Sequence, residues 1–318
     1  MPLSKTKKLR IPVTKSNWNK KTIVACMLPP IILYAVFGIY PSLMTFIYSF
    51  TNMSRVLSEP WQFVGLENYA EFFLKRNYRD TYEALLRTVI YAAAVTAIQN
   101  GIAMLIAVLL NNKKVKGRNF FRAIIFLPVI LGVTISCYAW SLFFSMDGPA
   151  SVILKLFGSF SSFLGDKTLA FPIVIFIQIW MGMGISLVLF LAGLQAIPNE
   201  LPEAAHIDGA GPVKSFWGVT FPLLWPTITV NVLLSLMGSL GSVQIILLTT
   251  SGQNNTSTLA SKILAEAFQL GKDSEVYFGT VRTYGQQGYA CALCMILFAL
   301  ILAATVTTQL YMRKGEKV

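Results

Sequence analysis

Residues 169–197 read LAFPIVIFIQIWMGMGISLVLFLAGLQAI, a stretch without one charged side chain. A helix needs about 20 apolar residues to cross the roughly 30 Å hydrocarbon core of a bilayer, and this stretch is long enough. Pro172 lies near its start and Pro198 directly follows it, which is typical of helix ends. Because every backbone group must be paired inside lipid, the stretch is predicted to be a membrane-spanning helix and not a strand.

Further apolar blocks of similar length lie on both sides of this stretch. They make the chain 55% hydrophobic and only 13% charged, whereas ordinary soluble domains are about 25% charged. The predicted spans cover residues 23–50, 89–110, 120–144, 169–197, 223–248 and 288–312. The sequence therefore predicts an all-α integral membrane protein with six transmembrane helices.

The basic residues indicate the orientation of these spans. The formal net charge is +12, and Lys and Arg crowd the first 21 residues and the loop from Lys113 to Arg122. Basic residues that flank spans mark cytoplasmic loops, so this distribution argues against nucleic-acid binding. The loop 198–222 departs from the rule, since it holds only Lys214 beside several acidic residues, and it needs a separate explanation.

This orientation gives a simple domain organisation. We expect a basic cytoplasmic segment at 1–22, a six-span domain at 23–312 and a cytoplasmic tail at 313–318. Both termini then lie on the cytoplasmic side of the membrane.

The cysteines do not indicate a metal site. Cys26, Cys137, Cys291 and Cys294 all fall inside predicted spans, and the last two are three residues apart on one helix face. No second cysteine pair or nearby histidine completes a ligand set. We interpret all four as small apolar residues that pack inside the protein.

A short polar stretch joins the fourth and fifth predicted spans. Residues 201–226 read LPEAAHIDGAGPVKSFWGVTFPLLWP. Pro202 suits the first turn of a helix, and Glu203 beside it complements the positive end of the helix dipole. Gly209 can end that helix and Pro212 can begin a second one. The stretch therefore predicts a helical hairpin at the cytoplasmic face.

The same stretch resembles a motif of a known family. Its pattern, Glu-Ala-Ala followed after three residues by Gly, is similar to the coupling motif of permease subunits in ATP-binding-cassette (ABC) importers. The residues that carry it are Glu203, Ala204, Ala205, Asp208 and Gly209. The wider run 201–226, with 192–198 and 248–258, resembles the carbohydrate-uptake branch of maltose, glycerol-phosphate and multiple-sugar type. The resemblance extends from about residue 28 to 312 and implies the type I importer permease fold.

The resemblance also implies partners and a mechanism. The motif would form a coupling helix in a groove of a cytoplasmic ATPase, with Glu203 paired to a basic residue and Gly209 permitting the turn. Two ATPase subunits would bind ATP and Mg, so no cofactor and no enzymatic activity are expected in this chain. A second permease subunit, expected to be a different chain, and an extracytoplasmic solute-binding protein would complete the importer.

Three features depart from the pattern of this family. Arg87-Thr88 stands where members often have Asn-Thr, and Val243-Gln244 stands where they often have Phe-Asp. The stretch 271–287 is also longer than the usual approach to the sixth span. These differences lie near the expected external side and bear on the substrate rather than on coupling.

Polar residues inside the spans are candidates for the path of the solute, because such residues usually face protein or a water-filled cavity. Sugars need hydrogen-bond partners and flat aromatic surfaces. The candidates are Asn231, Ser235, Gly238, Ser242, Gln178, Trp180 and Tyr138. Packing between helices is the alternative, since it also favours small and polar residues.

Two other classes of protein, and a non-sugar substrate for an importer of the same kind, remain as alternatives. An ion-gradient-driven transporter would more often carry carboxylates within its spans, and the predicted spans contain none. An integral membrane enzyme would need a catalytic motif, but HExxH, G-x-S-x-G and GxxxxGK[ST] are all absent. The single histidine, His206, lies inside the coupling motif and is interpreted as a polar surface residue.

Overall fold

The structure is a computed structural model that describes residues 20–53, 61–74, 78–112, 114–158, 160–268 and 287–315. Within these ranges the chain forms helices joined by turns, with one antiparallel β-bridge between Thr51 and Phe63. The chain divides into two compact units, Met1–Ile47 and Tyr48–Val318. Most of the predicted segment 1–22, part of the tail 313–318 and nearly all of the stretch 271–287 lie outside the described residues.

From Lys20 onward, the first unit is one long helical stretch. Helix α1 (Lys20–Tyr34) continues through a π-helical turn, η1 (Ala35–Ile39), into α2 (Tyr40–Tyr48). Residues 22–47 carry mostly apolar side chains, and none of them is buried within the chain. Apolar side chains on all sides of a helix suit contact with lipid. The first predicted span, 23–50, is therefore confirmed as a helix to within a few residues.

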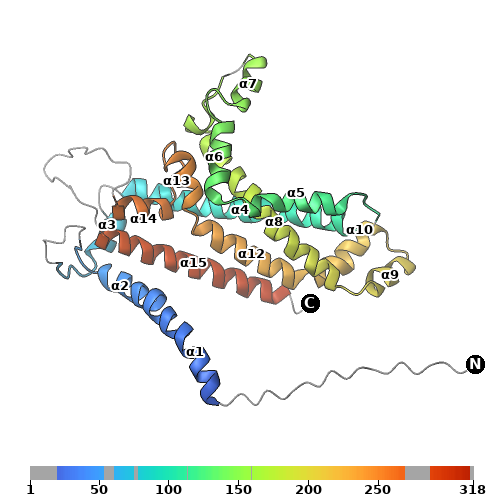
Figure 1. Cartoon of the computed structure of the whole chain (residues 1–318), viewed down its shortest axis with the longest axis horizontal. Helices are drawn as coiled ribbons and strands as arrows, with labels where there is room; N and C mark the ends of the chain where they lie inside the picture. The colour runs from blue at the N-terminus through green and yellow to red at the C-terminus, as the bar shows by residue number, and fades with distance from the viewer. Residues whose placement is uncertain are drawn as a thin grey trace, which may run out of the picture. The chain divides into compact units, whose positions relative to one another are not determined.

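The second unit contains the remaining helices (Figure 1). In chain order they are α3 (Glu67–Leu74), α4 (Tyr78–Asn111), α5 (Arg118–Ile130), α6 (Val133–Phe143), α7 (Pro149–Leu156), η2 (Phe163–Gly165), α8 (Ala170–Ala196), α9 (Glu200–Ile207), α10 (Pro212–Ser215), η3 (Phe216–Thr220), α11 (Phe221–Leu223), α12 (Trp225–Leu240), α13 (Gln244–Thr250), α14 (Leu259–Phe268) and α15 (Gln287–Gly315).

The number of spans agrees with the sequence when bent helices are counted as single spans. Four continuous helical stretches of the described chain are long and apolar enough to cross a membrane, and two bent helix pairs raise the number to six. The continuous stretches are Thr22–Tyr48, Asp80–Asn111, Ala170–Ala196 and Gln287–Arg313. The bent pairs are Arg118–Ile130 with Val133–Phe143, and Pro212–Leu223 with Trp225–Leu240.

Helix α4 begins about ten residues before the predicted span 89–110. Its first turns are polar, and Arg87 forms an ion pair with Glu83 one turn earlier, with Nη2 and Oε2 2.6 Å apart. Such i,i+4 pairs support a helix outside lipid. Hydropathy marks only the apolar part of a helix, so it missed this polar extension.

The third predicted span, 120–144, is not one straight helix. It divides at Leu131 and Gly132, where the backbone becomes extended, and α5 and α6 meet at an angle of 101°. Pro128 lies in the last turn of α5, and Gly132 precedes the first residue of α6. A glycine has low helix propensity and a proline removes a backbone donor, so this is a weak point for helix continuation.

The fifth predicted span, 223–248, is also divided. Helix α12 ends at Leu240, residues 241–243 leave the helix, and α13 follows. A second bend, of 68°, separates the segment Pro212–Leu223 from α12. The predicted boundaries were therefore wrong, because an uninterrupted apolar run does not reveal where the backbone bends.

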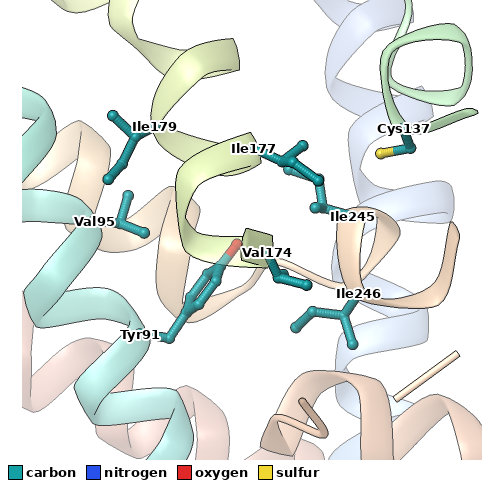
Figure 2. Packing of buried hydrophobic residues seen from close by; sticks show 8 residues of the cluster. All are labelled: Tyr91, Val95, Cys137, Val174, Ile177, Ile179, Ile245 and Ile246. Atoms are coloured by element: carbon teal, nitrogen blue, oxygen red, sulfur yellow. The ribbon is translucent and has the colours of Figure 1, made fainter. Parts of the chain in front are cut away.

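The core of the second unit lies between α4, α8 and α13. Figure 2 shows Tyr91 and Val95 of α4 facing Val174 and Ile179 of α8, with Ile246 of α13 beside them. A second cluster joins the other halves of α4 and α8 and includes Leu224. Helix α8 packs on other helices along one side, whereas Phe176, Ile185 and Val188 are exposed on another side, where apolar side chains suit contact with lipid.

Helix α8 approaches its neighbours closely at glycines. A Cβ on Gly184 would lie 2.7 Å from Cγ2 of Val129 and 2.9 Å from the carbonyl oxygen of Ile125. A Cβ on Gly182 would collide with the side chain of Gln99. Small residues let helix backbones pack this tightly in a membrane.

This packing predicts opposite effects for two Gly→Ala substitutions. Gly184→Ala should destabilise the protein by about 1–3 kcal/mol, because α5 must move away from α8. Gly101→Ala is the matched control, since Gly101 of α4 has no atom within 4 Å of an added Cβ. It should be neutral or stabilise by up to about 1 kcal/mol, because alanine favours a helix. Thermal unfolding in detergent measures both, and equal midpoints would contradict the packing at Gly184.

Candidate functional site

The predicted hairpin between the fourth and fifth spans is present. Helix α9 begins at Glu200 and ends at Ile207, with Pro202 in its first turn. Glu200 and Glu203 also lie in this turn, where their charge complements the helix dipole. The second helix, α10, begins with Pro212 at its first position, as the sequence predicted.

The turn after α9 is a Schellman motif centred on Gly209. The N–H of Ala210 donates to the carbonyl of Ala205 at 2.9 Å, and the N–H of Gly209 donates to the carbonyl of His206 at 3.1 Å. Gly209 has φ +80°, a conformation that side chains with a Cβ rarely adopt. The imidazole Nδ1 of His206 lies 2.8 Å from the carbonyl oxygen of Ala210 and closes the turn.

The hairpin presents its motif residues to the outside. Glu203, Ala204, Asp208 and Gly209 are exposed, and Ala205 is half-buried. In the described part of the chain, the carboxylates of Glu203 and Asp208 have no ion-pair partner. Apolar side chains flank the turn, because Ile207 is 87% exposed and Val213 is 73% exposed. The surface combines negative charge with apolar contact area, as a docking surface would.

The base of the hairpin is fixed in the core. Ile197, just before it, and the fully buried Leu224, just after it, belong to the cluster between α4 and α8. Val115, from the basic loop between α4 and α5, packs on the same cluster. The indole N–H of Trp225 donates to the carbonyl of Met312, near the end of α15, at 2.7 Å. The hairpin, the basic loop and the end of α15 therefore lie together (Figure 1).

Most of the polar candidates for a solute path lie between helices. The Nδ2 group of Asn100 donates to Oγ of Ser235 at 2.7 Å, which joins α4 to α12. Oε1 of Gln178 accepts hydrogen bonds from Tyr91 and from Ser242, both at 3.1 Å. The second of these bonds joins α8 to the break after α12. These contacts join helices whose residues are 64 to 135 positions apart in the sequence.

Asn231 differs from its neighbours. It is 2% exposed, yet its Nδ2 group has no hydrogen-bond partner among the residues that the structure describes. Within the same residues, Oδ1 of Asn100 and Oγ1 of Thr96 are also buried without partners. Buried polar groups are normally paired, so α4 and α12 retain unused hydrogen-bonding capacity.

The remaining candidates are distributed over other surfaces. Gly238 is exposed on α12, and Tyr138 is exposed on α6. Trp180 packs edge-to-face on Trp140 of α6, with ring centroids 5.4 Å apart. A shallow hollow of about 500 Å³ lies between α6 and α13 and is lined by Val133, Thr134, Gln244, Leu247 and Leu248.

Arg87, which departs from the family pattern, and its neighbour Thr88 have structural roles at the end opposite the hairpin. Oγ1 of Thr88 accepts the N–H of Leu259 at 2.8 Å, which attaches α14 to α4. Arg87 lies 3.5 Å from Oδ1 of Asn255. Asn254 donates to the carbonyl of Leu164 at 2.9 Å, so the loop after α13 rests on the loop before α8.

Sequence reasoning missed two residues that the structure brings to these sites, Tyr91 and Trp225. Both have an apolar body and one polar group, and such side chains usually find a hydrogen-bond partner when buried. That rule could have drawn attention to them, but it does not identify the partner.

Within the described residues no group of three or more His, Cys, Asp or Glu side chains could hold a metal ion.

Comparison with known proteins identifies the class. Residues 99–311 match the family described as "Binding-protein-dependent transport system inner membrane component". The chain belongs to this family and is a multi-pass membrane protein. It is the permease component of an ABC importer.

Individual relatives match nearly the whole chain. The chain is 32% identical over 277 residues to the multiple sugar-binding transport system permease protein MsmF of Streptococcus mutans, covering 86% of this chain and 89% of that one. It is 29% identical over 292 residues to the trehalose/maltose transport system permease protein MalF of Thermococcus litoralis, covering 91% and 92%.

A solved structure has the same fold. A chain of the bacterial alginate ABC transporter, in complex with alginate pentasaccharide-bound periplasmic protein, matches with a TM-score of 0.77. The match covers 93% of this chain and 95% of that one, at 21% sequence identity. It supports the fold of a type I importer permease.

Asn231 offers a test of the solute path. Asn231→Leu should leave the fold and subunit assembly intact, because the Nδ2 group that it removes has no partner. Transport should fall if that group serves the solute. Asn100→Leu is the comparison: it removes two hydrogen bonds, to Thr96 and Ser235, and should lower stability by about 1–3 kcal/mol. Unchanged solute uptake by Asn231→Leu would remove Asn231 from the path.

Proposed function

We propose that this chain carries a sugar or oligosaccharide across the cytoplasmic membrane of a bacterium, with energy from ATP hydrolysis on partner subunits. The observation that carries this proposal is the exposed hairpin α9–α10, whose Gly209 turn presents Glu203 and Asp208. Relatives that cover most of the chain are permeases named for multiple sugars, arabinooligosaccharides and trehalose or maltose, which supports a carbohydrate substrate.

The hairpin is the proposed docking site for an ATPase. Glu203 and Asp208 supply exposed negative charge. We therefore propose that Glu203 forms an ion pair with a basic residue of the ATPase. Ala204 and Ala205 allow close approach of the partner surface, and Gly209 sets the turn. ATP and Mg then bind to the two ATPase subunits, and this chain needs neither cofactor.

The distribution of charge supports a cytoplasmic hairpin. Lys114 and Lys116 are exposed in the loop that packs beside the hairpin base, and Arg313 is exposed near the end of α15. Positive charge flanking spans favours the cytoplasmic side. With six spans, both termini then lie inside the cell, and the loop around Asn254 and the first turns of α4 near Arg87 face the solute-binding protein.

The arm formed by α6 and α7 supports a second permease subunit. It extends away from the bundle of α4, α8 and α12 (Figure 1). Its apolar side chains are exposed, with Ile135 at 63%, Leu156 at 81% and Phe157 at 79%. We propose that this surface contacts a second, different permease chain and the surrounding lipid. The two permeases then enclose the path of the sugar.

The mechanism follows from these assignments. Closure of the ATPases on ATP moves the hairpins and opens the path toward the solute-binding protein, and hydrolysis resets the path inward. Such a cycle needs an arrangement of packed helices with two states. The bends near Gly132 and Leu224 divide two of the spans into shorter helical segments.

Uptake measurements test the energy source. The assembled transporter in proteoliposomes should accumulate labelled sugar only with ATP on the hairpin side and with the binding protein on the other. Collapse of the proton and sodium gradients should leave uptake unchanged. Loss of uptake after this collapse, with ATP present, would favour an ion-gradient-driven transporter. If ATP drove uptake of a non-sugar solute and of no sugar, the protein would be an importer of the same class with a different substrate.

Two glycines in the hairpin give a matched test of ATPase docking. Gly209→Ala places a Cβ on a residue with φ +80°, which should cost about 1–2 kcal/mol and loosen the turn. ATPase copurification and transport should both fall by about fivefold or more. Gly211→Ala is the control, since its φ is −67° and no atom lies within 4 Å of an added Cβ. Equal copurification of the two variants would contradict the proposed role of the turn.

A further inference from the structure

The second arm of the hairpin is attached to the bundle at two neighbouring residues. Leu224 is fully buried between α4 and α8. Trp225, the next residue, contacts α15 through the hydrogen bond from its indole N–H to the carbonyl of Met312. Both residues lie at the 68° bend between the hairpin and α12. A displacement of this second arm must therefore pass through the bend, whereas the first arm, α9, continues from α8.

The acceptor of the Trp225 hydrogen bond is a carbonyl at the end of a helix. Helix α15 ends at Gly315, so the carbonyl of Met312 lies in the last turn of the helix. Met312 is itself only 7% exposed. Loss of this bond would leave the indole N–H of the half-buried Trp225 unpaired, which is costly, so the bond should persist when the hairpin moves.

A series of aromatic rings connects the second arm of the hairpin to this bond. Trp217 contacts Phe221 with ring centroids 4.8 Å apart, and Phe221 contacts Trp225 at 5.8 Å. Phe216 contacts both Trp217 and Phe221, at 5.3 and 6.1 Å. Rings packed in this way resist independent movement. The aromatic series and the hydrogen bond together form a continuous connection from α10 to α15.

We propose that Trp225 is a positioning residue that couples displacement of the hairpin to the C-terminal end of α15. The proposal rests on the proposed function, in which an ATPase moves the hairpin. The Trp225 indole and the end of α15 then move with the hairpin as one body. Helix α15 packs on α12 and α14, so its displacement reaches the opposite end of the bundle, where Leu259 of α14 is attached to α4.

Removal of the indole N–H tests this coupling. Trp225→Phe retains an aromatic ring but removes the donor. In the assembled transporter we expect normal ATPase attachment and ATP hydrolysis, with about fivefold less sugar transported per ATP, as loss of one hydrogen bond would produce. Trp61→Phe is the control, because Trp61 lies in the segment before α3 and is 55% exposed. An unchanged ratio of sugar to ATP in Trp225→Phe would overturn the proposal.

A distance measurement keeps the proposal testable if Trp225→Phe does not assemble. Spin labels at Val213→Cys and Arg313→Cys, both exposed positions, report the separation of the hairpin from the end of α15 once the four native cysteines are replaced. With Trp225 present, this separation should stay constant between the nucleotide-free and ATP-bound transporter. A change on ATP binding would overturn the coupling. Absence of ATP-dependent uptake by the unmodified protein would instead contradict the proposed function.

Discussion

The packing of α8 against α4, α5 and α12 is the constraint on which the other parts of the second unit depend. Helix α8 has no charged residue. Neighbouring helices pack so closely on its glycines that an added Cβ would collide with them. In lipid, where apolar side chains gain little by leaving the solvent, close packing and interhelical hydrogen bonds must hold the bundle together. The bonds from Gln99 to Ser186 and from Tyr91 to Gln178 reinforce the same interface.

This interface also fixes the hairpin. Because α8 leads directly into α9 and Leu224 returns the chain to the α4–α8 cluster, the hairpin is short and anchored at both ends. Its exposed residues can therefore transmit a displacement to the bundle rather than absorb it in a flexible loop. The Schellman turn at Gly209 adds local rigidity, because it satisfies the carbonyls at the end of α9 without help from a partner.

The polar residues of the bundle serve helix packing in the observed arrangement, and this bears on how a solute path forms. Ser235, Ser242 and Gln178 all bond to residues on other helices, whereas Asn231 and Asn100 retain unpaired groups. A rearrangement of α4 against α12 would expose or pair these groups at little additional cost.

The sequence by itself determined the apolar helices, the hairpin and its family motif, because hydropathy, helix caps and glycine turns are local properties of the chain. For that reason Glu203 could be predicted to lie in the first turn of a helix and Gly209 in the turn that follows it. Only the tertiary structure decided that the apolar blocks 120–144 and 223–248 are each divided, and which polar groups meet. Ser242 leaves the helix where Gln178, 64 residues away in sequence, accepts its hydrogen bond. Trp225 likewise bonds to Met312, 87 residues away. Such contacts depend on how helices distant in the sequence pack together, and no local pattern encodes that packing.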